Sequence, residues 1–99
     1  MASGTSARRA LRVLELLKGQ TLHGLSNGEI ATALGETAVN ISRALEVLVD
    51  EGFVTKLDTG RYAHTVKMLQ IAQAHANEMS RAQNRIMEIN QRVAAGSMN

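Results

Sequence analysis

The 99-residue sequence contains no cysteine, no proline and no tryptophan, and only one tyrosine and one phenylalanine. Without cysteine there can be no disulfide framework and no thiolate metal site, which is compatible with a reducing compartment. No apolar run approaches the roughly 20 residues that a membrane-spanning helix needs, and no signal-peptide core is present, so we expect no membrane partner. With so few aromatic residues, the core must consist mainly of aliphatic side chains and methionine, which favours helices.

Size and charge indicate one small globular domain. A chain of this length can bury one modest core, and its apolar content of 44% is that of a globular protein. The net charge is only +2. Basic residues gather toward both ends, while the middle is acidic, mainly through Glu46, Asp50 and Glu51. This distribution can follow a phosphate backbone, but ordinary protein surfaces also show it, so charge alone does not identify a partner.

The first half of the sequence predicts a flexible arm over residues 1–6 and then three helices. Ser6 can cap the first helix, whose apolar residues recur at steps of three and four. These residues are Ala10, Leu11, Val13, Leu14 and Leu17. "SNGE" at 26–29 has the residues of a capping box and opens a short second helix that ends at Gly35. Thr37 can cap a third helix, and two helices joined by a tight turn form the helix-turn-helix pattern.

The third helix, predicted over residues 37–51, has two distinct faces. At about 100° per residue, one face collects the apolar residues Ile41, Ala44, Leu45, Leu48 and Val49. Val39 and Arg43 lie roughly opposite, with Asn40 on the flank. The apolar face suits a core, and the other face leaves an amide, a guanidinium and an isopropyl group for another task.

Residues 53–64 predict a β-hairpin, or wing, directly after the third helix. "FVTKL" suits a strand, "DTG" a turn, and Arg61-Tyr62 begin the return strand. The first 64 residues, apart from the arm, therefore read as a winged helix-turn-helix domain over 7–64, in a mainly α fold with a small β-hairpin.

A long C-terminal helix is predicted over residues 65–95, followed by a tail over 96–99. Along one side of this helix, a row of mostly apolar residues recurs at alternating steps of three and four. This spacing is that of a heptad repeat, and we call the row the seam. The seam consists of Leu69, Ala72, Ala76, Met79, Gln83, Ile86, Asn90 and Val93. A lone helix with this seam would be marginal in water, so it should pack on something. We infer that it pairs two copies in a homodimer; the alternative is that it folds back onto its own domain.

Several stretches of the sequence resemble the winged helix-turn-helix domain of IclR-type transcriptional regulators. They are "ALRVLELL", "LSNGEIATALG", "SRALEVLVDEGFV" and "GRYAHTVKML", and the resemblance covers about residues 8–72. It implies double-stranded DNA as the partner and a bacterial, cytoplasmic protein that is associated with the nucleoid when bound.

The sequence departs from this family at two places. Glu36-Thr37 stand where the family usually has an apolar residue and proline, and Ala38, Val39 and Asn40 replace small hydroxyl residues. The DNA sequence that the family reads is therefore not carried over. The family also has a large C-terminal effector domain, whereas this chain has only a helix there, so we expect no small-molecule effector for this chain.

A recognition helix places its N-terminal residues against base edges in the major groove. Asn40 has the donor and acceptor that adenine needs, Arg43 can grip guanine with two hydrogen bonds, and Val39 can contact a thymine methyl group. Each has a plainer alternative. Asn40 can be a solvated residue near a cap, Arg43 an ion pair with Glu46, and Val39 a packing contact.

Other residues are expected to contact phosphates and thereby position the protein. Free N–H groups at the start of the third helix favour an anion there. The expected positioning residues are Thr37, Ala38, Ser42, Lys56, Arg61, Arg8 and Arg9. For the wing, the alternative is a solvated hairpin tip. Glu36 would repel the same phosphate unless it turns aside or accepts from a cytosine amino group.

Nothing in the sequence indicates catalysis or a cofactor. His23, His64 and His75 lie far apart in the sequence and lack cysteine or paired carboxylate neighbours, so we expect no metal site. No nucleophile with a base beside it and no phosphate-binding loop stands out. We therefore expect no enzyme activity.

Three functions remain open from the sequence. The first is a sequence-specific DNA-binding protein, a small homodimeric transcriptional regulator. The second is a winged-helix docking module in a transcription or replication complex, with the acidic residues and the long helix as its binding surfaces. The third is a non-specific architectural DNA-binding protein of a phage or mobile element.

Overall fold

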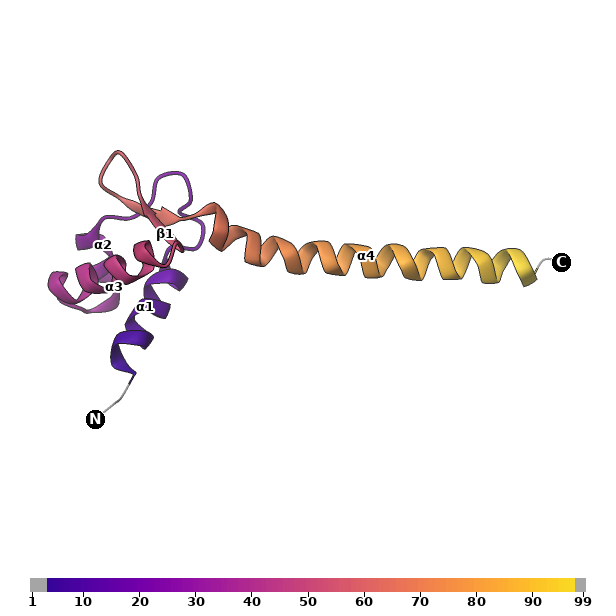
Figure 1. The fold of residues 1–99 in the computed structure, drawn as a ribbon, viewed down its shortest axis with the longest axis horizontal. Helices are drawn as coiled ribbons and strands as arrows, with labels where there is room; N and C mark the ends of the chain where they lie inside the picture. The colour runs from indigo at the N-terminus through magenta and orange to yellow at the C-terminus, as the bar shows by residue number, and fades with distance from the viewer. Residues whose placement is uncertain (1–3, 98–99) are drawn as a thin grey trace. The chain divides into compact units, whose positions relative to one another are not determined.

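A computed structural model of the protein describes residues 4–97. In chain order, the elements are α1 (Thr5–Leu16), α2 (Asn27–Leu34), α3 (Ala38–Asp50), β1 (Val54–Lys56), β2 (Tyr62–His64) and α4 (Val66–Ser97) (Figure 1). The predicted mainly α fold with a β-hairpin and a long C-terminal helix is confirmed. The chain divides into two compact units, with the boundary between Leu69 and Gln70. The first unit holds the three short helices, the hairpin and the first residues of α4.

The core of the first unit is aliphatic, as the scarcity of aromatic residues predicts. Its buried residues come from α1 or its C-cap, α2, α3 and the two strands: Val13, Leu17, Ile30, Ala31, Ile41, Ala44, Leu45, Leu48, Val54 and Ala63. Two predicted inward positions are wrong. Leu11 is 64% exposed because, at about 100° per residue, it lies nearly opposite the buried Val13, and Val49 is 39% exposed because it lies at the edge of the buried face of α3. The core therefore fastens α3 by one face only.

Local side-chain chemistry sets the starts of α2 and α3. Ser26 Oγ accepts from the Glu29 N–H at 3.1 Å, and the Glu29 carboxylate accepts from the Ser26 N–H at 2.9 Å, which confirms the capping box. Gly35 ends α2 at φ 65°, and Thr37 caps α3 by accepting from the Asn40 N–H. These bonds satisfy helix-end donors that would otherwise lack partners.

The start of α1 differs from the prediction. Gly4 is the N-cap residue and provides no side-chain cap, and Ser6 lies inside the helix. Ser6 therefore does not cap α1, and α1 takes in residues 5 and 6 of the predicted arm. Residues 1–3 of that arm and residues 98–99 of the predicted tail lie outside the described residues.

The hairpin is tied to the loop before α2. β1 and β2 pair antiparallel with Val54 opposite His64, and Leu25 forms a bridge to Tyr62 on the other side of β2. The Leu25 N–H donates to the Tyr62 carbonyl at 2.9 Å, and the Tyr62 N–H donates to the Leu25 carbonyl at 2.8 Å. β2 is thus bonded on both sides, to β1 and through one isolated bridge to Leu25, so the wing is anchored to the loop before α2.

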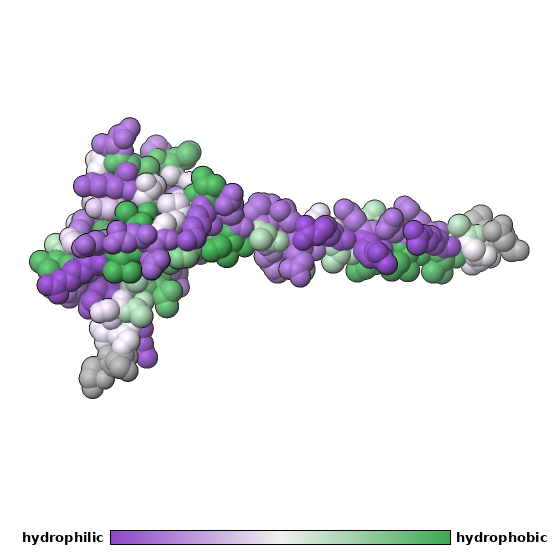
Figure 2. Space-filling view, in the orientation of Figure 1, coloured by the Kyte–Doolittle hydropathy of each residue, from purple (hydrophilic) through white to green (hydrophobic). Residues whose placement is uncertain are grey.

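The helix α4 continues from the first unit into the second without interruption, ending at Ser97 rather than near residue 95 as predicted. In its distal part, Figure 2 shows apolar side chains along one side and hydrophilic side chains along the other. The exposed large apolar residues beyond the unit boundary are Ile71, Met79, Ile86, Met87, Ile89 and Val93. No helix in the described range 4–97 combines the length and apolar character required to cross a bilayer.

Candidate nucleic-acid interface

The outward face of α3 carries two side chains that the protein itself does not use. Val39 is 60% exposed. Arg43 is exposed, and neither ion pair of the described residues involves it, so the expected alternative of a pair with Glu46 is not formed in this structure. Both residues lie in the N-terminal half of α3, opposite the buried Ile41. This half of the helix offers one apolar and one cationic contact to a partner.

Asn40 lies beside these residues but is half-buried and already hydrogen-bonded. Its Nδ2 donates to Glu36 Oε2 at 3.3 Å, and the same oxygen accepts from Arg9 Nε of α1 at 3.0 Å. The Arg9 and Glu36 side chains are 16% and 24% exposed. Glu36 therefore turns toward its own protein, and it joins α1 to the start of α3.

The expected positioning residues at the start of α3 lie close together. Thr37, Ala38 and Ser42 are all exposed. Ser42 Oγ accepts from Asn27 Nδ2 at 2.6 Å, which links α3 to the first residue of α2 and leaves the Ser42 hydroxyl hydrogen for another acceptor. A phosphate at this helix end would meet hydroxyl groups and a favourable helix dipole.

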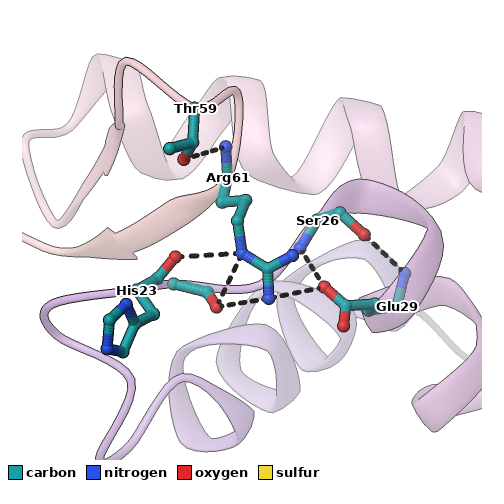
Figure 3. A network of polar contacts seen from close by, with 6 residues as sticks. His23, Ser26, Glu29, Thr59 and Arg61 are labelled. Carbon is teal, nitrogen blue, oxygen red and sulfur yellow. Dashed lines mark hydrogen bonds and ion pairs between the residues drawn. The ribbon is translucent and has the colours of Figure 1, made fainter.

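In the wing, Arg61 is occupied by its own protein. Its guanidinium donates to the carbonyls of His23 and Gly24 at 3.0 Å and pairs with the Glu29 carboxylate at 2.9 Å (Figure 3). These bonds tie the wing to the preceding loop and to the capping box of α2. Arg61 therefore has a structural task that the sequence did not indicate, beside the phosphate contact predicted for it.

The remaining predicted cations are more accessible. Lys56 is exposed, with Nζ 5.9 Å from the centre of the Tyr62 ring. Arg8 is also exposed, in the first turns of α1. Two shallow grooves flank α3 inside the first unit. One lies between α1 and α3 and measures about 270 Å³, and the other lies between α3 and the hairpin and measures about 240 Å³.

The network around Glu29 makes stability depend on pH. The hydrogen bonds from Ser26, and then the charge of Arg61, hold the pKa of Glu29 below its ordinary value. Because the folded-state pKa is the lower one, the carboxylate stabilises the fold above the ordinary pKa of about 4.3. That contribution is lost as the pH falls through the folded-state pKa. In urea unfolding across acidic pH, Glu29→Gln should show a flatter loss of stability than the wild type.

The control for this prediction is Glu78→Gln, which removes a carboxyl group from α4 and leaves the capping box intact. It should keep the wild-type pH dependence. An equal flattening in both variants would show that overall charge, rather than the Glu29 network, produces the effect.

Sequence reasoning missed the partners of Asn40 and Arg61. The spacing of four between Glu36 and Asn40 was a usable signal, because residues four apart are neighbours at the start of a helix. Arg9 to Glu36 and Arg61 to Gly24 span 27 and 37 residues, and no pattern marks them.

Histidine positions give no ligand cluster. His64 Nε2 lies 2.7 Å from the Leu14 carbonyl oxygen, so this nitrogen carries the hydrogen and joins β2 to α1. Among residues 4–97, no three side chains of histidine, cysteine, aspartate or glutamate are grouped to hold a metal ion.

Comparisons with known proteins agree with this geometry. A family model described as the IclR helix-turn-helix domain matches residues 6–58, which is more than half of the chain and includes all of α2 and α3. None of the curated proteins compared with the chain matches it. The capped pair α2–α3, the hairpin that follows and the family match lead to one conclusion: the chain belongs to the family of IclR helix-turn-helix domains.

Proposed function

We propose that the chain is a homodimeric transcriptional regulator that reads the major groove of double-stranded DNA with the N-terminal half of α3. The family match makes it a DNA-binding protein. The observation that supports base reading is the pair of exposed side chains, Val39 and Arg43, on a helix held to the core by its other face. An arginine that has no partner in the described chain is free to bind guanine with two hydrogen bonds.

The arrangement around α3 supports a division into reading and positioning. The free N–H groups and hydroxyls at the start of α3 suit one phosphate. Lys56 in the wing and Arg8 in α1 are exposed cations on elements that flank α3. In this proposal Lys56 and Arg8 contact DNA phosphates on either side of α3. Arg61 contributes mainly by holding the wing in place.

One observation supports the alternative function, a module that docks onto other proteins. Glu46, Asp50 and Glu51 are all exposed on the second half of α3 and its C-cap. A titration of the protein with duplex DNA at low salt separates the two functions. The DNA-binding proposal predicts an affinity tighter than micromolar that weakens steeply with salt. Weaker binding under these conditions would favour protein docking through the acidic residues.

The homodimer is the second part of the proposal. The distal part of α4 carries apolar side chains along one side, and a long amphipathic helix gains stability by pairing its apolar side. The predicted seam from Leu69 to Val93 includes Gln83 and Asn90, which would define register at some cost in stability. A symmetric dimer should prefer a palindromic DNA site with two half-sites.

We expect Ile86→Asp to convert the dimer into a monomer. Each buried isoleucine contributes about 2 kcal/mol, so losing one from each chain should raise the dissociation constant roughly 10³-fold or more. Asn77→Asp is the control, since nine residues at about 100° place it on the opposite side of the helix. Sedimentation equilibrium should show a dimer for the wild type and Asn77→Asp. A monomeric wild type would contradict the homodimer and favour a helix that folds back.

A further inference from the structure

Glu36 occupies a position where a carboxylate should be unfavourable for DNA binding. It directly precedes Thr37, the N-cap of α3, where the proposed function places a phosphate. Yet its Oε2 atom accepts hydrogen bonds from both Arg9 and Asn40. The carboxylate is therefore positioned between α1 and Asn40, for which the sequence predicts base reading.

The chemistry of this contact determines which way the Asn40 amide faces. A carboxylate only accepts hydrogen bonds, so the Asn40 nitrogen, not its oxygen, must face Glu36. The amide nitrogen carries two hydrogens. The bond to Glu36 uses one of them, and when that is the hydrogen trans to Oδ1, the other lies on the same edge as Oδ1. That edge, with one donor and one acceptor, is the edge that pairs with adenine.

Arg9 offsets the unfavourable charge of the Glu36 carboxylate at this position. Its Nε lies 3.0 Å from Glu36 Oε2, and the two side chains are largely screened from solvent. The ion pair offsets the negative charge that a nearby phosphate would meet, and it also holds the carboxylate toward Asn40. Two different elements, α1 and the turn before α3, thereby act on one amide.

We propose that Glu36 is a positioning residue that fixes the orientation of the Asn40 amide, with Arg9 holding Glu36 in place, so that the protein gains base preference at the expense of general DNA affinity. This inference rests on the proposed function, with Asn40 reading a base as the sequence predicts. A purely structural role would predict weaker binding to every duplex when Glu36 is removed. This proposal instead predicts a lower base preference together with a higher affinity for random duplex.

The test compares the wild type with Glu36→Ala and Glu36→Gln on the duplex selected by the wild type, on a duplex with the base pair opposite Asn40 changed, and on random duplex. Both variants lose a negative charge near phosphate, so affinity for random duplex should rise a few-fold. Preference for the selected duplex over the changed one should fall about tenfold in Glu36→Ala. The fall should be smaller in Glu36→Gln, whose side chain accepts hydrogen bonds as well as donating them.

Asn40→Ala completes a double-mutant cycle. If Glu36 acts through Asn40, adding Glu36→Ala to Asn40→Ala should leave the base preference unchanged while still raising affinity for random duplex. Thermal unfolding of each variant checks that the fold is kept, and Glu36→Gln supplies the answer if Glu36→Ala unfolds. Unchanged preference in both Glu36 variants, or a parallel fall on all three duplexes, would overturn this inference alone. A wild type without any sequence preference would remove the proposed function as well.

Discussion

Replacing Arg43 with alanine is expected to weaken binding to the preferred duplex by about 10- to 100-fold, since a bidentate contact to guanine contributes about 1–3 kcal/mol. Arg43 is exposed on the outward face of α3, and no ion pair in the described chain engages it. Its removal should therefore leave the fold intact. On random duplex only one charge is lost, and the affinity should fall about threefold or less.

Arg43→Lys is the matched variant for this prediction. Lysine keeps the positive charge but cannot offer the planar pair of donors that matches guanine. Fluorescence anisotropy should show that Arg43→Lys binds random duplex with an affinity close to that of the wild type. Its affinity for the preferred duplex should be close to that of Arg43→Ala. An equal loss on both duplexes for Arg43→Ala would show that Arg43 only contacts the backbone.

Gly24→Ala is expected to cause the largest loss of stability among alanine substitutions at the described glycines of the first unit. Gly24 is buried at φ +68°, and an added Cβ would lie 2.5 Å from the backbone oxygen of Tyr62. That oxygen accepts the bond that pairs β2 with Leu25, so relief of the clash must disturb the wing. The left-handed conformation and the clash together should cost about 2–5 kcal/mol, a large fraction of the stability of a small domain.

Gly19→Ala separates the two causes. Gly19 also has a positive φ, +78°, but an added Cβ there meets nothing within 4 Å. It should therefore cost only about 1–2 kcal/mol, the conformational part. Urea unfolding of both variants measures the difference. Equal losses would mean that the contact with Tyr62 gives way easily and does not fix the loop.

Features that depend on neighbouring residues were predictable from the sequence. The capping box at Ser26, the cap at Thr37 and the stop at Gly35 arise from short-range hydrogen bonds and backbone preference, and each is confirmed. The predicted start of α1 was wrong. Ser6 has the chemistry of a cap, but the helix begins at Thr5 and does not use it. Local chemistry shows which residues can cap a helix, not which potential cap is used.

Features that depend on distant contacts were only partly predictable. The outward placement of Val39 and Arg43 follows from helical period, and both are exposed. Val49 was assigned to the core because period alone does not say where an apolar stripe ends, and Leu11 because it stands three residues before Leu14 although it lies nearly opposite Val13. The bonds from Glu36 to Arg9 and from Arg61 to Gly24 depend on tertiary packing. They change how the interface is understood, since they tie up groups that sequence reasoning left free.

Selection from random duplex DNA with the purified protein decides whether α3 reads bases, because it reports binding, base preference and half-site spacing together. We expect an enriched inverted repeat, with half-sites about one helical turn or a multiple of it apart. Selection with Arg43→Ala should lose preference at one base pair in each half-site. A pool that binds but shows no enriched sequence, or one whose enriched sequence is unchanged by Arg43→Ala, would contradict the claim that α3 reads bases.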